Sequence, residues 1–366
     1  MDYRVYCGVD FHARQQTICS LTTEDGVVST HELKHHDKTE LRAFYSQFSG
    51  PVLVGLEASG FSPWFEQLLE ELGCEVWLGD AIEISRRARR RQKNDQRDAE
   101  LILDLLVHHE FPRIHRPTPQ SREILRMLRY RQKLVKMRTM IKNSLQALSL
   151  QSGLSRRSQL FTKVGLEQLR AVTMSPVMQY QRDQWLAALG PLNERINETV
   201  IWLKQQAKGD QRIGRLRTHP GIGLLTALAI VHTLEPVGRF RNQRQVAAYG
   251  GFDPREHSSG EKKRYLGISK AGSRLLRFFM VEAAHTAVRY DDDLQRFYRR
   301  LHLRRGKPTA KVAVARKLLV RSYILLRDEI DYAEFGRRAV AAGLARALHR
   351  PQVPEVLIGR PASTAH

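Results

Sequence analysis

The fold of the N-terminal region is decided by the stretch Tyr3-Arg4-Val5-Tyr6-Cys7-Gly8-Val9-Asp10, whose composition predicts a strand ending on a carboxylate. Two more strands are predicted at residues 17–22 and 27–33, joined by the hairpin signal Asp25-Gly26. Helical and strand-like segments then alternate: a helix at 37–48, a strand at 51–56, a helix at 62–73 and a strand at 75–78. A hairpin followed by such an alternation predicts an α/β fold, with a mixed five-stranded sheet flanked by helices.

The whole chain is strongly basic. Its 366 residues include 60 Lys and Arg against 38 Asp and Glu, which gives a formal net charge of +22. Nucleic acid is the leading candidate partner, because Lys and Arg replace the counterions of phosphates. Apolar residues make up 42% of the chain, which excludes a disordered protein. We expect no membrane span, no secretory signal and no disulfide or zinc site, and therefore a cytoplasmic protein.

The middle of the chain is predicted to be helical. One long helix is expected at 119–150, where apolar residues recur at spacings of three, four and seven, and a second at about 191–206. The two are expected to form a coiled coil, either antiparallel within the chain or between chains. Residues 152–190 between them contain no motif that predicts a structure or a function.

The C-terminal region begins near residue 211. Its expected elements are a turn at 219–223, helices at 224–234, 242–249, 269–287 and 311–326, and a Gly-, Ser- and Lys-rich loop at 250–267. The predicted division of the chain is therefore 1–115, 116–210, 211–335 and a weakly ordered tail at 336–366.

Four carboxylates are candidates for a metal site. Asp10 ends the first strand and Glu57 ends the fourth, while Asp95 and Asp98 lie three residues apart and share a helix face. Four converging carboxylates repel one another unless a divalent cation neutralises them, and oxygen ligands favour Mg²⁺ or Mn²⁺. Each of them also has an ordinary interpretation, as a turn residue, a helix-terminal acid or a partner of a nearby arginine.

A basic run precedes the acidic pair. Residues 86–97 contain seven basic residues and one acidic residue, and they are interpreted as a groove that guides phosphates toward the carboxylates, against the simpler alternative of a solvated surface. The candidate nucleic-acid-binding residues of this run are Arg86, Arg87, Arg89, Arg90, Arg91 and Lys93.

Two motifs of the C-terminal region are candidates for phosphate chemistry. Ser258-Ser259-Gly260 lies in a cationic loop, where a serine could form a covalent ester and nearby Lys and Arg could stabilise the pentavalent phosphorus, but such loops are also common linkers. Pro220-Gly221-Ile222-Gly223 looks like a helix-hairpin-helix turn with amides for a phosphate, or is an ordinary turn between helices. The further candidate nucleic-acid-binding residues are Gly221, Gly223, Lys262, Lys263, Arg264 and Lys270.

The ordered motifs resemble a known family. Gly8-Val9-Asp10-Phe11-His12, Gly55 to Gly60 and Lys93 to Ala99 look like the three acidic motifs of DEDD-type insertion-sequence transposases, which are bridge-RNA-guided serine recombinases. Pro220 to Gly223, Ala248 to Gly251, Ser258 to Gly260 and Ile268 to Gly272 look like the family's C-terminal transposase domain. The resemblance covers roughly residues 3–330, and it implies an N-terminal RuvC-like domain with an RNase H-like fold.

The resemblance also implies roles for these residues. Asp10, Glu57, Asp95 and Asp98 match the metal-binding tetrad, and Ser259 matches the catalytic serine, although the doubled serine leaves Ser258 as an alternative. The implied partners are donor DNA, target DNA and a structured guide RNA. The protein is implied to act as a homo-oligomer, a dimer or tetramer, that associates with the bacterial nucleoid when active. The implied reaction is excision and insertion of a mobile element through a phosphoserine; the alternative is a metal-dependent endonuclease similar to a Holliday-junction resolvase.

Overall fold

The computed structural model describes residues 3–87, 94–155, 159–259 and 262–343, without the side chains of residues 256–259 and 262–266. Within it the chain forms two compact units, which meet in sequence between Arg116 and Pro117.

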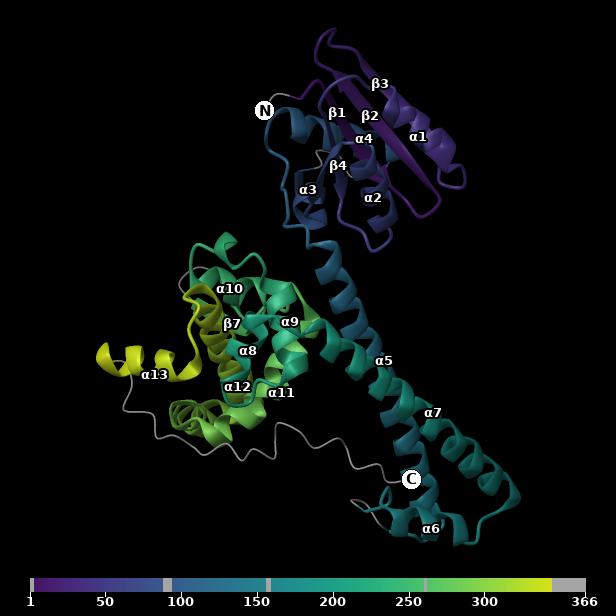
Figure 1. Cartoon of the computed structure of the whole chain (residues 1–366), viewed down its shortest axis with the longest axis vertical. Helices are drawn as coiled ribbons and strands as arrows, with labels where there is room; N and C mark the ends of the chain where they lie inside the picture. The colour runs from purple at the N-terminus through teal and green to yellow at the C-terminus, as the bar shows by residue number, and fades with distance from the viewer. Residues whose placement is uncertain (1–2, 88–93, 156–158, 260–261, 344–366) are drawn as a thin grey trace. The chain divides into compact units, whose positions relative to one another are not determined.

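The N-terminal unit is built on a five-stranded sheet (Figure 1). Its strands are β1 (Val5–Phe11), β2 (Gln15–Thr22), β3 (Val28–Lys34), β4 (Val52–Glu57) and β5 (Glu75–Gly79). They are arranged in the order β3-β2-β1-β4-β5. β1 pairs antiparallel with β2 and parallel with β4, so the mixed five-stranded sheet predicted from sequence is confirmed.

Helices cover both faces of this sheet. They are α1 (Lys38–Ser46), α2 (Pro63–Glu71), α3 (Ala81–Arg87) and α4 (Asp95–Val107). The alternation of β1 divides the core: Val5, Cys7 and Val9 are buried with residues of α1 and α2, whereas Tyr6 is buried with Ile102 and Leu106 of α4. By the same alternation Gly8 and Asp10 belong to the α4 face. The helix start predicted at Asp37 is confirmed, because its carboxylate accepts from the Thr39 amide at 2.8 Å.

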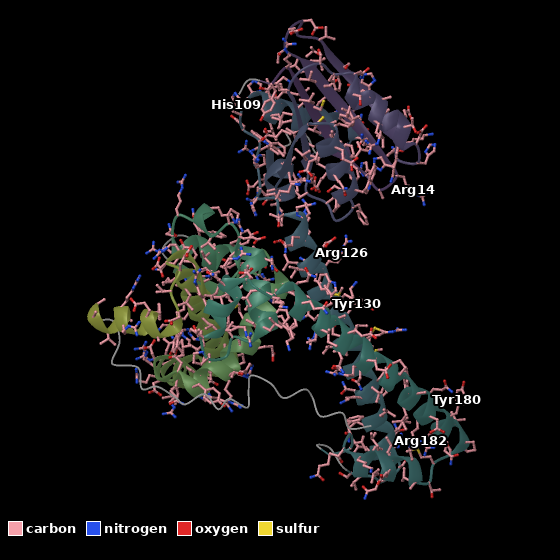
Figure 2. All side chains as sticks on the ribbon, viewed as in Figure 1. Arg14, His109, Arg126, Tyr130, Tyr180 and Arg182 are labelled. Atoms are coloured by element: carbon pink, nitrogen blue, oxygen red, sulfur yellow. The ribbon has the colours of Figure 1, made fainter. Side chains whose placement is uncertain are left out.

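The second unit begins with two long helices, α5 (Pro119–Gln151) and α7 (Pro176–Gln206), with the short α6 (Lys163–Ala171) between them. Leu203 near the end of α7 is buried with Leu125 near the start of α5, while Leu192 is buried with Leu145. The pair is therefore antiparallel within the chain. Side chains such as Arg126 and Tyr130 of α5 and Tyr180 of α7 extend from these helices (Figure 2).

The predicted start of the second long helix at Pro191 was wrong. Ser175-Pro176 carries the same start signal, and the Ser175 hydroxyl accepts a hydrogen bond from the Met178 amide. Pro191 lies inside α7 on an exposed position, where the hydrogen bond that proline cannot donate is lost on the side facing solvent. Together with α6, more than half of the segment without a motif is therefore helix.

The C-terminal part is a helical bundle around one large core. Its elements are α8 (Gln211–Arg217), α9 (Leu224–Leu234), the 3₁₀ turn η1 (Val237–Arg239), α10 (Gln243–Tyr249), β6 (Pro254–Ser259), β7 (Lys262–Ile268), α11 (Arg274–Tyr290), α12 (Asp292–Arg327) and α13 (Tyr332–Ala341). No helix of the described residues is long and apolar enough to cross a membrane.

Four expectations for this part need correction. The loop predicted at 250–267 is mostly the β6–β7 hairpin. Its polar sequence gives no strand signal, because a two-stranded ribbon does not require alternating apolar residues. The helix predicted at 269–287 starts later, at the cap Ser273, and the helix predicted at 311–326 is the second half of α12. The tail was expected to be weakly ordered from residue 336, but α13 continues through Ala341 with its Gly336 buried; residues 344–366 lie outside the described residues.

Candidate active site

The site begins with Asp10 near the end of β1. Its side chain is only 16% exposed, because β1 is a central strand and α4 covers this face of the sheet. One of its oxygens, Oδ2, is buried, and although the His12 ring lies 3.1 Å away, no described residue donates a well-aligned hydrogen bond to it. A buried carboxylate oxygen without a donor is costly, and a bound cation is one way to satisfy it.

Helix α4 brings two more carboxylates to Asp10. The helix starts at Asp95, where the Asn94 side chain accepts from the Gln96 amide, and both Asp95 and Asp98 lie in its first turn. The helix can approach β1 closely because Gly8 has no side chain: a Cβ atom there would lie 2.4 Å from both the Ala99 oxygen and the Leu103 nitrogen. Packing on Gly8 therefore sets how closely the first turn of α4, with Asp95 and Asp98, approaches the end of β1.

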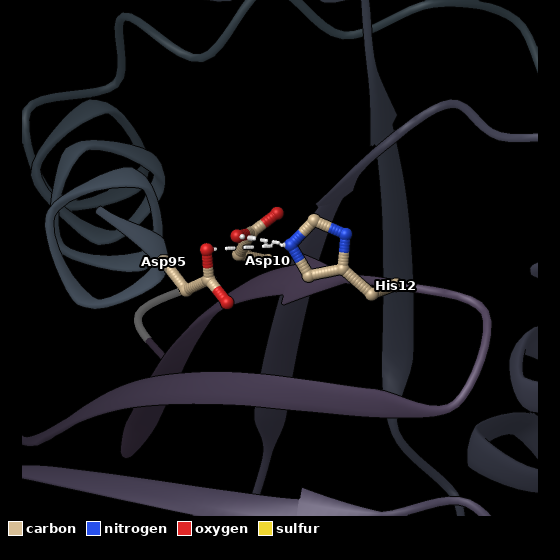
Figure 3. A group of neighbouring side chains, drawn as sticks. All are labelled: Asp10, His12 and Asp95. Carbon is tan, nitrogen blue, oxygen red and sulfur yellow. Dashed lines mark ion pairs between the residues drawn. The ribbon is translucent and has the colours of Figure 1, made fainter. Parts of the chain in front are cut away.

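His12 completes the cluster. Its Nε2 atom lies 3.1 Å from Asp10 Oδ2 and 3.5 Å from Asp95 Oδ1 (Figure 3). Ligand atoms of Asp10, His12 and Asp95 all lie within 4.8 Å of one another. Sequence reasoning quoted His12 in a motif but did not predict it as a site residue. The signal was its position two residues after Asp10, since alternate residues of a strand face the same side.

The other two predicted carboxylates join this group to different degrees. Asp98 is near enough to act electrostatically on Asp10. Glu57 follows Leu56, which pairs with Val9, so the backbone puts Glu57 beside Asp10 on the neighbouring strand. Its side chain is exposed, and within the described residues it is not a member of the compact group. The structure therefore gathers Asp10, Asp95, Asp98 and His12, with Glu57 close by in the backbone only.

The electrostatics of Asp10 fit a cation. Burial raises the pKa of its carboxyl above the usual value, the charges of Asp98 and Asp95 raise it further, and His12 opposes them. The ionised form is thus disfavoured in the free protein. Carboxylates provide the hard oxygen ligands that both Mg²⁺ and Mn²⁺ take, and the imidazole adds a nitrogen ligand that Mn²⁺, as a transition metal, accepts more readily than Mg²⁺ does. The donor set and the unsatisfied Oδ2 atom together fit a divalent cation.

The basic run is described only in part. Arg86 pairs with Glu83 at 2.5 Å, and Arg87 contacts the backbone oxygen and the carboxylate of Glu110. Arg89, Arg90, Arg91 and Lys93 lie outside the described residues. Because Arg86 and Arg87 are exposed and their partners are surface carboxylates, these ion pairs are weak and a phosphate could replace them.

The serine motif lies in the β6–β7 hairpin. The register pairs Ser258 with Lys263 and Ser259 with Lys262, and Arg264 is paired with His257. Consecutive positions of a strand alternate, so Ser258 and Ser259 belong to opposite faces of the ribbon. Cationic positions accompany both serines across the hairpin.

The base of this hairpin is held by the motifs that flank it. The Ser269 hydroxyl donates to Asp253 Oδ1 at 2.6 Å, and the Ser269 amide donates to the Asp253 oxygen at 2.8 Å. Arg277 donates to the backbone oxygens of Gly250 and Gly272. Lys270, next to this anchor, is exposed and has a positive φ of 57°.

The two glycines of the helix-hairpin-helix candidate differ. Gly221 has a φ of +89°, and a Cβ atom there would lie 2.6 Å from the Ala283 oxygen of α11, so packing alone requires a glycine. Gly223 is exposed and precedes α9 without a side-chain cap. The amides at the start of α9 therefore have no side-chain partner at the cap, as phosphate binding would require.

Comparisons with known proteins match the two regions that contain these motifs. A family model described as a transposase, of the DEDD type of IS110 elements, matches residues 7–152, and one described as the transposase IS116/IS110/IS902 family matches residues 214–299. The protein named "Probable family 20 transposase" of Pseudomonas aeruginosa is 29% identical over 89% of this chain and 97% of its own length.

Two further relatives differ in how much they share. The transposase for insertion sequence element IS1111A of Coxiella burnetii is 28% identical over 89% of this chain and 90% of its own. The pilin gene-inverting protein of Moraxella bovis is 32% identical, but over only 32% of this chain and 38% of its own.

Proposed function

We propose that the chain belongs to the IS110 family of DEDD transposases and that it is an RNA-guided DNA recombinase that excises and inserts a mobile element. The family implies an RNase H-like fold for the N-terminal unit, which agrees with its mixed five-stranded sheet. The observation that carries the proposal is the acidic cluster around the buried, unsatisfied Oδ2 atom of Asp10 in a chain of net charge +22.

The acidic cluster is proposed to hold Mg²⁺ or Mn²⁺. Asp10, Asp95 and Asp98 would be ligands, Glu57 would join them from the neighbouring strand, and His12 is an added candidate. A divalent cation at such a site supplies Lewis acidity to a phosphodiester and stabilises the oxygen that leaves. The residues themselves would position the cation at the carboxyl ends of β1 and β4, where a phosphate guided by the basic run at 86–97 would arrive.

Ser259 is proposed as the nucleophile that conserves the phosphodiester. Its hydroxyl gives up a proton, its oxygen bonds to phosphorus, and the bond from phosphorus to one deoxyribose oxygen breaks. That deoxyribose oxygen takes up a proton and leaves as a hydroxyl. Religation reverses these changes, so strands are exchanged without an external energy source. Lys262, Lys263 and Arg264, on the paired strand, would stabilise the pentavalent phosphorus.

The proposed partners are donor DNA, target DNA and a structured guide RNA, with the protein acting as a dimer or tetramer. Gly221, Gly223 and Lys270 would contact phosphates without reading sequence. Delegating sequence choice to RNA pairing fits a chain that is rich in Lys and Arg, because phosphate contacts position a nucleic acid without specifying its bases.

The alternative is a metal-dependent, junction-resolvase-like endonuclease. It is favoured by the acidic cluster taken alone, which gathers three candidate metal ligands without any contribution from a serine. Such an enzyme would need Asp10 but would tolerate Ser259→Ala, and it would release DNA ends instead of rejoining them.

A plasmid assay tests the proposal. The gene is placed with its native flanks, and the circular junction left by excision is amplified for the unchanged protein, Asp10→Ala, Ser259→Ala and Ser258→Ala. We expect no junction from Asp10→Ala and Ser259→Ala, and a normal yield from Ser258→Ala. Because the two serines belong to opposite faces of β6, Ser258→Ala is a matched control. Junction formation by Ser259→Ala would reject the serine mechanism, and junction formation by Asp10→Ala would reject the metal site.

A further inference from the structure

Helix α12 contains, on both sides of its Gly306 kink, a dense group of cations that no motif identified. Residues 295–311, here called the basic segment, contain seven basic residues and no acidic residue. They are Arg296, Arg299, Arg300, Arg304, Arg305, Lys307 and Lys311. All except Lys311 are exposed. The segment includes Gly306, whose non-helical backbone divides α12 into two parts.

None of these seven side chains forms an ion pair with any described residue. The second half of the same helix is different, because Lys317, Arg321 and Arg327 pair with Asp293, Asp291 and Asp328. These three charges are thus neutralised within the fold, whereas those of the basic segment stay available. Unpaired like charges at this density repel one another, and the fold gains nothing from them.

The basic segment also exposes an apolar side chain. Leu303 is 87% exposed, and it lies seven, four and three residues after Arg296, Arg299 and Arg300. These spacings put the four residues on one face of the helix. On the other side of the helix Leu294 is buried in the core and Phe297 packs against it. The helix therefore presents arginines around one leucine on its outer face.

We propose that the basic segment binds duplex DNA along this face, with its arginines on phosphates and Leu303 toward the base edges. The inference rests on the proposed function for the premise that the chain acts on DNA, and it adds a binding surface apart from the acidic cluster and the serine hairpin. The helix before Gly306 is long enough to lie in a groove: residues 292–305 at about 1.5 Å each span roughly 20 Å.

Duplex DNA fits this face better than duplex RNA does. The major groove of B-form DNA is about 12 Å wide and admits a helix, whereas the major groove of A-form RNA is too deep and narrow. An apolar side chain among arginines can contact a thymine methyl group or enter between base pairs. Five of the seven cations are arginine, the residue that binds phosphate through two parallel hydrogen bonds.

The test is a binding measurement on the full chain. Binding to a labelled DNA duplex of about 30 base pairs is measured by fluorescence anisotropy at several salt concentrations, in EDTA and without guide RNA. The variant is Arg299→Gln/Arg300→Gln/Arg304→Gln. The matched control, Arg327→Gln/Arg337→Gln/Arg338→Gln, removes the same charge from arginines that are paired with Asp328 and Glu334.

We expect the variant to weaken DNA binding about tenfold or more and to reduce the salt slope by about two to three, close to 0.9 for each lost phosphate contact. The control keeps the slope of the unchanged chain. Leu303→Ala, at an exposed position that cannot disturb folding, should lower affinity and leave the slope unchanged.

Equal slopes for the variant and the control would overturn the proposal. So would a loss on an RNA duplex that equals or exceeds the loss on DNA, because the assignment to the DNA major groove would then fail. Since binding is read in EDTA, the result does not depend on catalysis. A chain that binds as expected but forms no circular junction would count against the proposed function and leave this surface standing.

Discussion

Gly8 of β1 lies directly against Ala99 of α4, so close that a Cβ atom on Gly8 would be 2.4 Å from the Ala99 oxygen. The neighbouring strand repeats the feature, because Gly55 pairs with Gly8 and a Cβ atom there would be 2.7 Å from the Leu106 side chain. Because these two glycines have no side chains, α4 can pack closely against β1 and β4. The geometry of the acidic cluster depends on this close packing, since α4 carries Asp95 and Asp98.

Gly8→Ala should therefore damage stability and metal binding together. The added methyl group would clash with backbone atoms of α4, which cannot rotate away as a side chain can, so α4 must move away from β1. We expect a loss of about 1–3 kcal/mol in the free energy of unfolding. Urea unfolding measures the loss, and a Mn²⁺ titration of the folded variant should give a weaker affinity. Gly60→Ala is the control, because a Cβ atom there meets nothing within 4 Å. Similar losses for both variants would contradict the close approach as the cause.

Asp10→Asn should separate the destabilisation of the fold by the buried Asp10 charge from the role of that charge in metal binding. The raised pKa of Asp10 means that its protonated form favours the metal-free fold and its ionised form destabilises it. The stability contributed by the protonated carboxyl is therefore lost as pH rises from the ordinary Asp pKa through the pKa in the folded protein. In EDTA at pH 8 we expect the variant to melt at a temperature equal to or above that of the unchanged chain. Mn²⁺ should raise the melting temperature of the unchanged chain only.

The control for this experiment is Asp104→Asn, which removes an exposed carboxylate from the same helix. It should keep the stabilisation by Mn²⁺. An equal Mn²⁺ effect in Asp10→Asn would place the cation elsewhere.

His12→Ala should distinguish metals. An imidazole contributes more to binding of a transition metal than to binding of Mg²⁺, which prefers oxygen. We expect the affinity for Mn²⁺ to fall by roughly tenfold or more, a loss of the order seen when groups around a metal site are removed, and the affinity for Mg²⁺ to fall less. Isothermal titration of both metals measures the difference. Unchanged affinity for Mn²⁺ would mean that His12 only pairs with Asp10 in the metal-free protein.

Much of the fold could be predicted because local signals and global structure agree in the N-terminal unit. The strand that carries Asp10 and the helix cap at Asp37 are set by local sequence signals, and both are present in the fold. His12 was missed as a site residue because its importance comes from α4, whose position depends on the contact at Gly8. The hairpin containing Ser259 and the true start of α7 were missed for other reasons: a polar ribbon lacks a periodic signal, and Pro191 competes with Pro176 as a start signal.

A buried charge cluster supports the last prediction. His219 precedes the Pro220 turn and is fully buried, with Nε2 at 3.8 Å from Asp291 Oδ2. Arg321 pairs with Asp291, and the Tyr332 hydroxyl donates to Asp291 Oδ2 at 2.8 Å. Asp293 and Lys317 extend the cluster on the far side of Arg321. Burial and the charge of Arg321 lower the pKa of His219 to about 4, against the opposing effect of Asp291.

The free energy of unfolding should therefore fall in mild acid. The unfolded chain takes up a proton at an imidazole pKa of 6.5, whereas folded His219 stays neutral until its pKa of about 4. The stability contributed by neutral His219 is complete above pH 6.5 and is lost as pH falls toward 4, by at most about 1.4 kcal/mol per pH unit. Urea unfolding at pH 7.5 and 5.0 should show a loss roughly 2 kcal/mol larger for the unchanged chain than for His219→Gln. His285→Gln, on α11 outside this cluster, should behave like the unchanged chain. If His219→Gln lost as much stability as the unchanged chain, the pH dependence would have to come from other groups.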